Sequence, residues 1–92
     1  MQERLEAIIT GRVQMVMYRD FAQRKAKGLK LVGEVQNLPN KTVRVVAEGP
    51  RVTLNHYVEK LKKGSLLSCV ESVHPTWLPA TNSFTKFDIN YD

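Results

Sequence analysis

The order in which strand-like and helix-like hydrophobic patterns follow one another constrains the fold of this chain most. Within residues 5–13, small and apolar residues stand at every second position, which is the period of a half-buried strand. Within residues 18–29, apolar residues recur at steps of three and four, which predicts a helix with one apolar face. Two further strand patterns, over residues 32–36 and 42–47, flank the turn "NLPNK" and predict a hairpin.

The second half of the chain continues this succession of elements. Gly49 and Pro50 precede an apolar stripe at helical spacing, which predicts a helix with the proline in its first turn and Gly64 as its stop. The segments "SCVESVH" and "FTKFDINY" are typical of strands, and "PTWLPATNS" between them is typical of a loop. The predicted order is therefore β-α-β-β-α-β with a short terminal strand.

This order predicts an α+β fold. Two helices on one face of an antiparallel sheet, joined by right-handed crossovers, form the split β-α-β or ferredoxin-like sandwich. The chain has 92 residues and shows no repeat, linker or low-complexity tract, so we expect one domain over residues 1–92. No segment is marked as an interface, and we expect a monomer.

The composition is that of a globular domain with a basic surface. Fourteen Lys and Arg residues against nine Asp and Glu residues give a net charge of +5, which favours anionic partners such as phosphate esters or nucleic acid. No apolar run reaches the length of a membrane span, and no leader is apparent at the start of the sequence. Cys69 is the single cysteine, which excludes an internal disulfide and fits a reducing cytoplasm.

Few side chains suit conventional catalysis. His56 and His74 show no metal-ligand spacing with Cys69 or with paired carboxylates, so we expect no metal site. Cys69 has no basic or helix-terminal neighbourhood, which indicates a buried or half-buried thiol rather than a nucleophile. A nucleotide-binding P-loop is absent from the sequence.

The stretch "GRVQMVMYRD", residues 11–20, joins the first predicted strand to the first predicted helix. Unpaired N–H groups and the helix dipole create positive potential at a helix start. Amides of a curled loop can point at one oxyanion, and Arg19 can close over it with two hydrogen bonds. An arginine is otherwise poorly placed there, because the dipole repels a cation. From these residues alone, an anion site and a solvated surface arginine both remain open.

Asn37 is a second candidate for this site. It stands at the end of the second predicted strand, just before the hairpin turn. In a split β-α-β sandwich that strand is next to the first helix, so the Asn37 side chain can face the loop before that helix. Its amide offers a hydrogen-bond donor and an acceptor. A turn-capping asparagine is the alternative.

Two segments resemble the signature motifs of the acylphosphatase family. "GRVQMVMYRDF" resembles G-x-V-Q-G-V-x-F-R, and "GEVQNLPNKTVRVVAEG", residues 33–49, resembles G-W-V-x-N-x-x-x-G-x-V followed by a further glycine. The likeness continues through "LNHYVEKLKKG" and "FTKFDINYD" and covers nearly the whole chain. Two motifs in the right order and spacing make this resemblance specific.

The resemblance implies a small cytosolic hydrolase that cleaves the carboxyl-phosphate bond of acyl phosphates without a metal or cofactor. Carried over by position, Arg19 binds the phosphate and Asn37 orients the attacking water. The phosphate-binding residues are then Gln14, Met15, Val16, Met17, Tyr18 and Arg19. Inorganic phosphate is expected as product and inhibitor, and no nucleic-acid or membrane partner is expected.

The chain departs from each of the two motifs at two positions. Met15 replaces a glycine; if that position requires a positive φ or close approach of the phosphate, methionine costs about 1 kcal/mol in strain and crowds the loop. Tyr18 replaces phenylalanine, and we expect its ring to pack and its hydroxyl to reach solvent. Glu34 replaces an aromatic residue. Lys41 replaces the hairpin glycine, and we expect Asn40 to take the left-handed conformation instead.

Two other functions are compatible with the same fold. The first is a non-catalytic anion-binding module, in which Met15 has abolished turnover. The second is a nucleic-acid-binding sheet, suggested by the +5 charge and by the same order of elements in RNA-recognition domains. Such domains stack bases on exposed aromatic residues of the sheet, whereas the segment "TVRVVA", residues 42–47, contains no aromatic residue.

Overall fold

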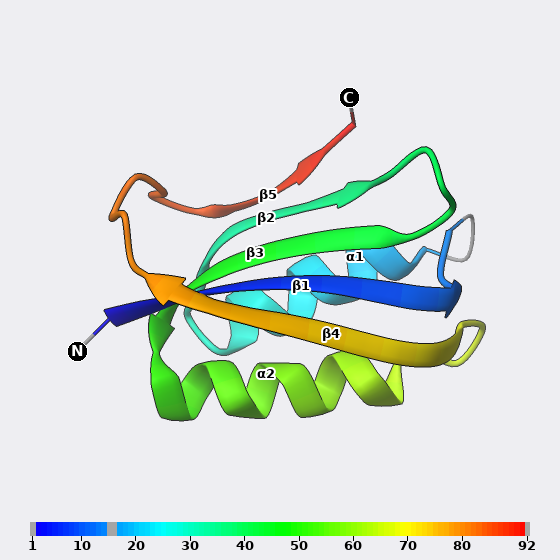
Figure 1. Cartoon of the computed structure of the whole chain (residues 1–92), viewed down its shortest axis with the longest axis horizontal. Helices are drawn as coiled ribbons and strands as arrows, with labels where there is room; N and C mark the ends of the chain where they lie inside the picture. Colours follow the sequence, from blue (N-terminus) through cyan, green and yellow to red (C-terminus); the bar gives the residue numbers. More distant parts are fainter. Residues whose placement is uncertain (1, 15–16, 92) are drawn as a thin grey trace.

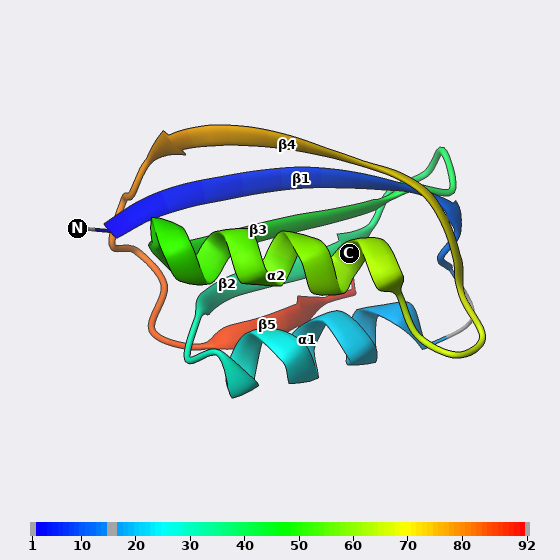
Figure 2. The ribbon, with the colours of Figure 1, turned by 90° about the horizontal axis from the view of Figure 1, so that it is seen from below.

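A computed structural model describes residues 2–14 and 17–91 of the chain. The elements form two layers, with both helices against one face of a single sheet (Figure 1, Figure 2). In chain order they are β1 (Gln2–Arg12), α1 (Tyr18–Gly28), β2 (Val32–Asn37), β3 (Val43–Pro50), α2 (Arg51–Lys63), β4 (Cys69–Pro79) and β5 (Phe87–Asn90). This is the predicted ferredoxin-like α+β sandwich. Of the residues described, no helix is long and apolar enough to cross a membrane.

The five strands pair in the order β4-β1-β3-β2-β5. The first four pair antiparallel as predicted, but β5 pairs parallel to β2, with Gly33 opposite Phe87 and Gln36 opposite Asn90. The sheet is therefore mixed, and the prediction of an antiparallel sheet was wrong for its last strand. The cause is the connection over residues 80–86, which turns back at the end of the sheet so that β5 runs opposite to β4 (Figure 1). That direction is also the direction of β2.

β4 is longer than the sequence predicted. The loop expected over residues 75–83 begins only after Pro79, because β4 stays paired with β1 as far as the pair of Glu3 and Pro79. Pro75 and Pro79 are compatible with a strand here because β4 forms an edge of the sheet, where a proline can turn its ring nitrogen to the open side.

The helix after β3, α2, begins at Arg51. Pro50 is its N-cap and does not lie in its first turn as predicted.

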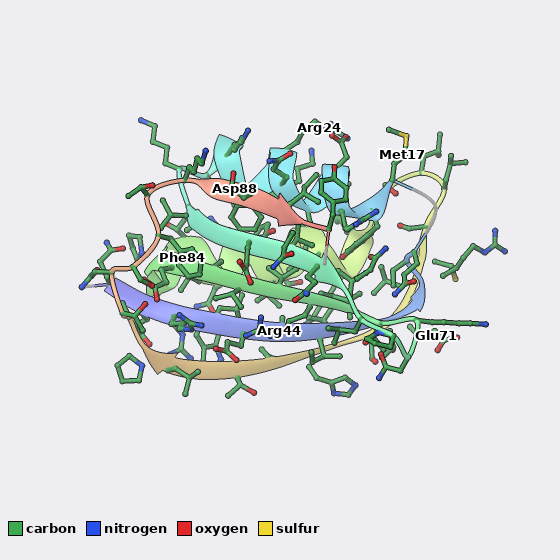
Figure 3. The ribbon with its side chains drawn as sticks, turned by 90° about the horizontal axis from the view of Figure 1, so that it is seen from above. Met17, Arg24, Arg44, Glu71, Phe84 and Asp88 are labelled. Atoms are coloured by element: carbon green, nitrogen blue, oxygen red, sulfur yellow. The ribbon has the colours of Figure 1, made fainter. Side chains whose placement is uncertain are left out.

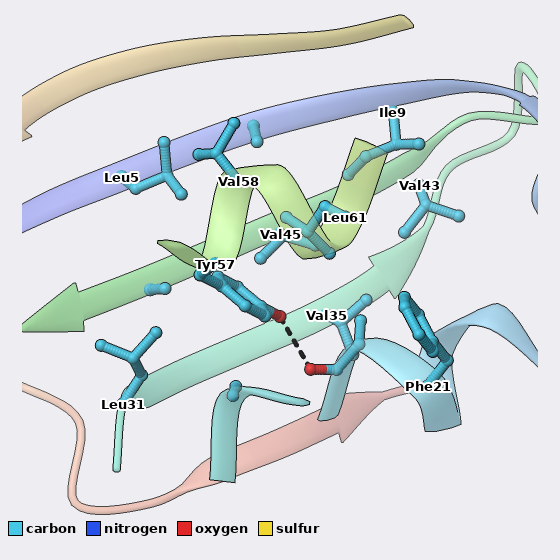
Figure 4. Close-up of a cluster of buried hydrophobic side chains, with 14 of the residues drawn as sticks. Leu5, Ile9, Phe21, Leu31, Val35, Val43, Val45, Tyr57, Val58 and Leu61 are labelled. Carbon is cyan, nitrogen blue, oxygen red and sulfur yellow. Dashed lines mark hydrogen bonds between the residues drawn. The ribbon is translucent and has the colours of Figure 1, made fainter. Parts of the chain in front are cut away.

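The core lies between the sheet and the helices, and the predicted apolar stripes supply it (Figure 4). Its helical members are Tyr18, Phe21, Ala22 and Ala26 from α1, and Leu54, Tyr57, Val58 and Leu61 from α2. The Tyr57 hydroxyl donates to the carbonyl of Ala22 at 2.8 Å, which ties the two helices together inside the core (Figure 4). Because both helices bury one stripe on the same sheet face, their starting points are fixed relative to the strand ends.

Gly11 forms a bulge near the end of β1. The register between β1 and β4 shifts between Thr10 and Gly11, and Gly11 has a φ of 120°. A Cβ at this position would stand 2.1 Å from the carbonyl oxygen of Cys69, so only glycine fits the backbone here. A bulge bends its strand and turns the residues that follow. This explains why a glycine stands near the end of β1, just before the loop that leads to α1.

The sheet face turned away from the helices carries paired charges. The Arg44 guanidinium lies 3.6 Å from a carboxylate oxygen of Glu6 and 3.6 Å from one of Glu34 (Figure 3). The Nε of Arg4 lies 2.9 Å from Glu6. Half-exposed pairs of this kind stabilise the fold only modestly. These pairs do compensate the charge of this face. Glu34, which stands where the motif has an aromatic residue, contributes one carboxylate to them.

Glu48 is a buried carboxylate, 3% exposed, that holds the connection between β4 and β5. It accepts hydrogen bonds from the N–H groups of Thr81 and Asn82, at 2.9 and 3.0 Å, and Arg4 lies 3.3 Å away. Burial by itself raises the pKa of Glu48, but the bonds from Thr81, Asn82 and Arg4 outweigh burial and leave the pKa below its ordinary value. The charged carboxylate is therefore the form that the fold stabilises.

We expect Glu48→Gln to lower the free energy of unfolding by about 1–3 kcal/mol at neutral pH, because the amide loses charge-assisted hydrogen bonds. Since the folded pKa is lowered, the carboxylate stabilises the fold above its ordinary pKa of 4.5, and this stabilisation is lost as the pH falls through the folded pKa. Urea unfolding should thus show a difference in the free energy of unfolding between parent and variant. This difference should be largest at neutral pH and shrink below pH 4.5. Glu71→Gln, at an exposed position of β4, is the control and should change little. A difference between parent and Glu48→Gln that does not shrink in acid would contradict this assignment.

Candidate active site

The loop that follows β1 lies against the hairpin turn between β2 and β3. The Gln14 side chain joins them, because its Nε2 donates to the carbonyl oxygens of Leu38 at 2.9 Å and of Thr42 at 2.8 Å. The turn uses the same two carbonyls: the N–H of Leu38 donates to Thr42 at 2.9 Å, and the N–H of Lys41 donates to Leu38 at 3.2 Å. Gln14 therefore fixes the loop relative to Asn37, the residue just before Leu38.

Arg19 stands in the first turn of α1, as predicted. The first helical bond runs from the N–H of Phe21 to the carbonyl of Met17, at 3.0 Å, so the N–H groups of residues 18–20 have no acceptor within the helix. Met17 occupies the N-cap position and supplies no side-chain cap. These amides and the helix dipole make the start of α1 receptive to an anion.

Asp20 lies in the same turn of α1. Its carboxylate is at the helix end that favours negative charge. It also pairs with Arg24, one turn later, at 2.9 Å. The charge of Asp20 is thus compensated within α1.

Tyr91 contacts the Arg19 side chain. The guanidinium carbon of Arg19 lies 4.9 Å from the centroid of the Tyr91 ring, which is a cation–π distance. Tyr91 follows Asn90, which pairs with Gln36 in parallel register, so Tyr91 lies level with Asn37. Tyr91 was not among the residues predicted for the site. The sequence feature that could have indicated Tyr91 was its position as the last aromatic residue of the final predicted strand.

Asn37 is the last residue of β2, as predicted. Its Oδ1 is buried and has no hydrogen-bond partner among the described residues. A buried acceptor without a donor costs on the order of 1–3 kcal/mol. Such groups are rare in folded proteins, and each one calls for a specific reason. Asn37 therefore does not cap the turn through its side-chain oxygen.

The hairpin turn differs from the prediction at one residue. Lys41, with a φ of 69°, takes the left-handed conformation that was expected for Asn40. Asn40 instead caps the turn, because its Oδ1 accepts the N–H of Thr42 at 3.3 Å and also the Thr42 hydroxyl. Lys41, which stands where the motif has a glycine, thus has a left-handed backbone although it is a lysine.

Two of the predicted phosphate-binding residues, Met15 and Val16, lie outside the described residues. Met17 is described and has a φ of 60°, a left-handed conformation that costs a non-glycine residue about 1 kcal/mol. Its side chain is 73% exposed and points away from the molecule (Figure 3). Backbone strain of this kind is concentrated at functional sites.

Tyr18 packs in the core as predicted, but its hydroxyl does not reach solvent. The residue is 1% exposed, and its hydroxyl donates to the carbonyl of Leu61 at 2.8 Å. Burial raises the pKa of Tyr18, so the phenol stays protonated and remains a donor at neutral pH. Leu61 lies in the last turn of α2, where carbonyls lack helical partners. The Tyr18 hydroxyl therefore joins the start of α1 to the end of α2.

The other side chains with potential for catalysis are exposed on α2 and β4. Cys69 is exposed because it opens the edge strand β4, so the prediction of a buried or half-buried thiol was wrong. His56 is exposed on α2, and His74 is exposed within β4. Across residues 2–14 and 17–91, no three His, Cys, Asp or Glu side chains gather as a metal site requires.

The fold and these contacts define a small α+β sandwich with an anion-receptive helix start, an arginine and a buried amide oxygen at one end, the last without a partner in the part of the chain that the structure describes. The family model of acylphosphatases matches residues 5–89. An acylphosphatase of Thermus thermophilus is 50% identical over 74 residues, which are 80% of this chain and 84% of that protein. An acylphosphatase of Methanococcoides burtonii is 40% identical over 84 residues, 91% of this chain and 88% of that protein.

A solved structure agrees with these relatives. The crystal structure of acylphosphatase from Bacillus subtilis has a TM-score of 0.93 and 36% identity, over 97% of this chain and 99% of that one. The chain therefore belongs to the acylphosphatase family of hydrolases. The resemblance inferred from the two sequence motifs is confirmed.

We expect Gln14→Met, which keeps the length of the side chain but removes its donor, to lower the free energy of unfolding by about 1–2 kcal/mol, because two carbonyls of the turn lose a partner. Hydrogen exchange should also become faster at the amides of Leu38 and Lys41, whose acceptors Gln14 holds. Gln2→Met, at the exposed start of β1, is the matched control. Unchanged exchange at both amides would show that Gln14 does not hold the turn.

Proposed function

We propose that this chain hydrolyses acyl phosphates to a carboxylate and inorganic phosphate, by direct attack of water and without a metal or cofactor. Membership of the acylphosphatase family supports the substrate class. The observation that carries the mechanism is the Oδ1 of Asn37, which is buried and has no hydrogen-bond partner within residues 2–14 and 17–91, beside the loop that Gln14 holds against the hairpin.

Arg19 and the amides at the start of α1 hold the phosphoryl group in this proposal. Phosphoryl transfer has a loose transition state with charge spread over the equatorial oxygens. Fixed donors that face this charge can supply the largest catalytic contribution. Arg19 is free to turn to the phosphate because a cation–π contact to an exposed ring, such as Tyr91 at 76% exposure, contributes only about 0.5–1 kcal/mol.

Asn37 orients the attacking water. No described residue donates to its Oδ1, and a water that donates to this oxygen is held beside the phosphoryl group. Asparagine is too weak a base to remove the proton of that water. The contribution of Asn37 is therefore positional, through the conversion of an encounter with solvent into an oriented attack.

The chemistry balances without a general acid. The water oxygen forms a bond to phosphorus, and the bond from phosphorus to the bridging oxygen breaks, with its electron pair leaving on the carboxylate. A carboxylic acid has a pKa of about 4, so this leaving group departs without protonation. The proton of the water passes to a phosphoryl oxygen, and inorganic phosphate is released. No phosphoenzyme forms.

The alternative on the same scaffold is an anion-binding module in which Met15 has abolished turnover. It uses the same Arg19 and the same loop, and it differs only in the absence of hydrolysis. The nucleic-acid-binding alternative gains no support, because the open sheet face carries the paired charges of Arg44, Glu6 and Glu34.

We expect the parent to hydrolyse benzoyl phosphate in the presence of chelator, with inorganic phosphate as a competitive inhibitor. Arg19→Ala should lower kcat/KM about 10³-fold, because it removes the cation that faces the transition-state charge. Asn37→Ala should lower kcat about 100-fold with a small change in KM, because it affects orientation and not binding. The measurement is the loss of ultraviolet absorbance of benzoyl phosphate.

The controls for these variants are Arg51→Ala and Asn55→Ala, since both residues lie on α2 in its half away from the site (Figure 1). Both should keep the parent activity. Parent rates in Arg19→Ala, or turnover that disappears with chelator, would refute the mechanism.

Met15→Gly separates the two candidates. For an active hydrolase with a crowded loop, we expect kcat to rise by no more than about fivefold, which corresponds to relief of about 1 kcal/mol of strain. For a binding module, hydrolysis should appear only in Met15→Gly, while the parent is stabilised by phosphate in a thermal melt without turning over benzoyl phosphate. Hydrolysis of benzoyl phosphate by the parent would support the hydrolase and exclude the binding module.

A further inference from the structure

Three exposed apolar side chains gather beside the proposed phosphate site. Met17 is 73% exposed, Leu66 is 98% exposed and Leu67 is 65% exposed. The two leucines belong to the connection between α2 and β4, which passes beside the start of α1 (Figure 2). One hollow of about 260 Å³ is lined by Met17, Asp20, Arg24, Ser65, Leu66 and Leu67.

Packing does not explain these leucines. Neither of them belongs to the buried core or to the partly buried residues that pack against it. Single exposed apolar residues are ordinary, but apolar side chains that gather around a hollow mark a binding surface. The connection that carries them is therefore a candidate binding surface.

A second hollow places this surface next to Arg19. It measures about 280 Å³ and is lined by Met17, Arg19, Asp20, Ile89 and Tyr91. Met17 and Asp20 line both hollows. They form the boundary between the hollow that contains Arg19, the arginine side, and the hollow that contains Leu66 and Leu67, the leucine side. A molecule with its phosphate at Arg19 can thus reach Leu66 and Leu67 across Met17.

The leucine side carries no unpaired charge among its described lining residues. Asp20 and Arg24, its two ionic residues, pair with each other at 2.9 Å. A group that binds here meets leucine and methionine side chains and one compensated ion pair. This surface favours an uncharged, apolar group.

We propose that the hollow between Met17, Leu66 and Leu67 binds the acyl group of the substrate and selects aromatic or longer aliphatic acyl groups over small ones. This inference rests on the proposed function, since it assigns the phosphate of the same molecule to Arg19. Burial of apolar area against the leucines supplies the selectivity. The side chains of residues 17, 66 and 67 then determine specificity without taking part in the chemistry.

A different hollow beside the same loop suits another kind of group. It measures about 270 Å³ and is lined by Gly11, Arg12, Val13, Gln14 and Lys41. Its two cations would attract an acyl group that carries its own carboxylate. The exposed leucines have no counterpart there, which is why we assign the apolar acyl group to the leucine side.

The test compares benzoyl phosphate with acetyl phosphate in the parent and in the double variant Leu66→Ser/Leu67→Ser. We expect the parent to prefer benzoyl phosphate in kcat/KM by about tenfold, a ratio typical of a modest apolar pocket. The double variant should lose about fivefold in kcat/KM for benzoyl phosphate. Its activity on acetyl phosphate and its inhibition by inorganic phosphate should not change.

Val52→Ser is the matched control, because Val52 is 68% exposed and lies at the other end of α2. It should leave both activities at the parent level. A double variant that keeps the parent ratio of the two substrates, or that loses both activities equally, would overturn the assignment of the acyl group.

Binding separates this inference from the proposed function. Phenacylphosphonate and acetonylphosphonate carry a methylene in place of the bridging oxygen, so their affinities can be measured by calorimetry without turnover. Tighter binding of phenacylphosphonate that Leu66→Ser/Leu67→Ser abolishes supports the inference, even if the parent hydrolyses neither acyl phosphate and the proposed function fails. Equal affinity of the parent for both phosphonates would overturn the inference, even if hydrolysis is observed.

Discussion

The place of β1 between β3 and β4 is the constraint on which the rest of the structure depends. Pairing on both sides fixes where β1 ends, and the bulge at Gly11 turns the chain as it leaves the sheet. α1 follows within a few residues, so its unpaired N–H groups are held near the end of the same sheet. Arg19 and Asn37 are then carried by a helix and a strand whose positions the core determines, and rigid supports of this kind hold a site more precisely than loops do.

Contacts between distant segments complete this arrangement. Gln14 binds the carbonyls of Leu38 and Thr42, which connects the loop before α1 to the hairpin after β2. β5 lies parallel to β2 and brings Tyr91 level with Asn37, where its ring contacts Arg19. The two residues that the family resemblance assigns to catalysis therefore reach the same end of the sheet through two independent sets of contacts.

The sparse chemistry of the proposed site follows from its substrate. A carboxylate leaves without protonation, so the protein has to supply positive charge, backbone donors and an oriented water, and no acid, nucleophile or metal. Selectivity then has to come from the surroundings of the phosphate. Loops at a site vary without disturbing the core, and the leucines between α2 and β4 are placed where such variation would act on the acyl group.

The hydrophobic periods of the sequence predicted both helices, the hairpin and the core faces, because local patterns decide which side of an element is buried. Arg19 became a candidate because a cation at a helix start conflicts with the dipole, and Asn37 because it ends a strand next to that helix. The family resemblance then assigned both residues to the site. Local patterns could not predict the capping of the turn. Asn40 uses its side chain there, and Lys41 takes the left-handed backbone.

The sequence by itself thus determined the order of elements, the residues of the core and the family to which the chain belongs. Only the tertiary structure decided the direction of β5, the contact of Tyr91 with Arg19, the burial of the Tyr18 hydroxyl and the place of Leu66 and Leu67 beside the site. The physical reason is the same in each case. Periodicity reports the environment of a residue, whereas these features depend on pairing between segments that are far apart in the chain, and that pairing is set by the whole sheet.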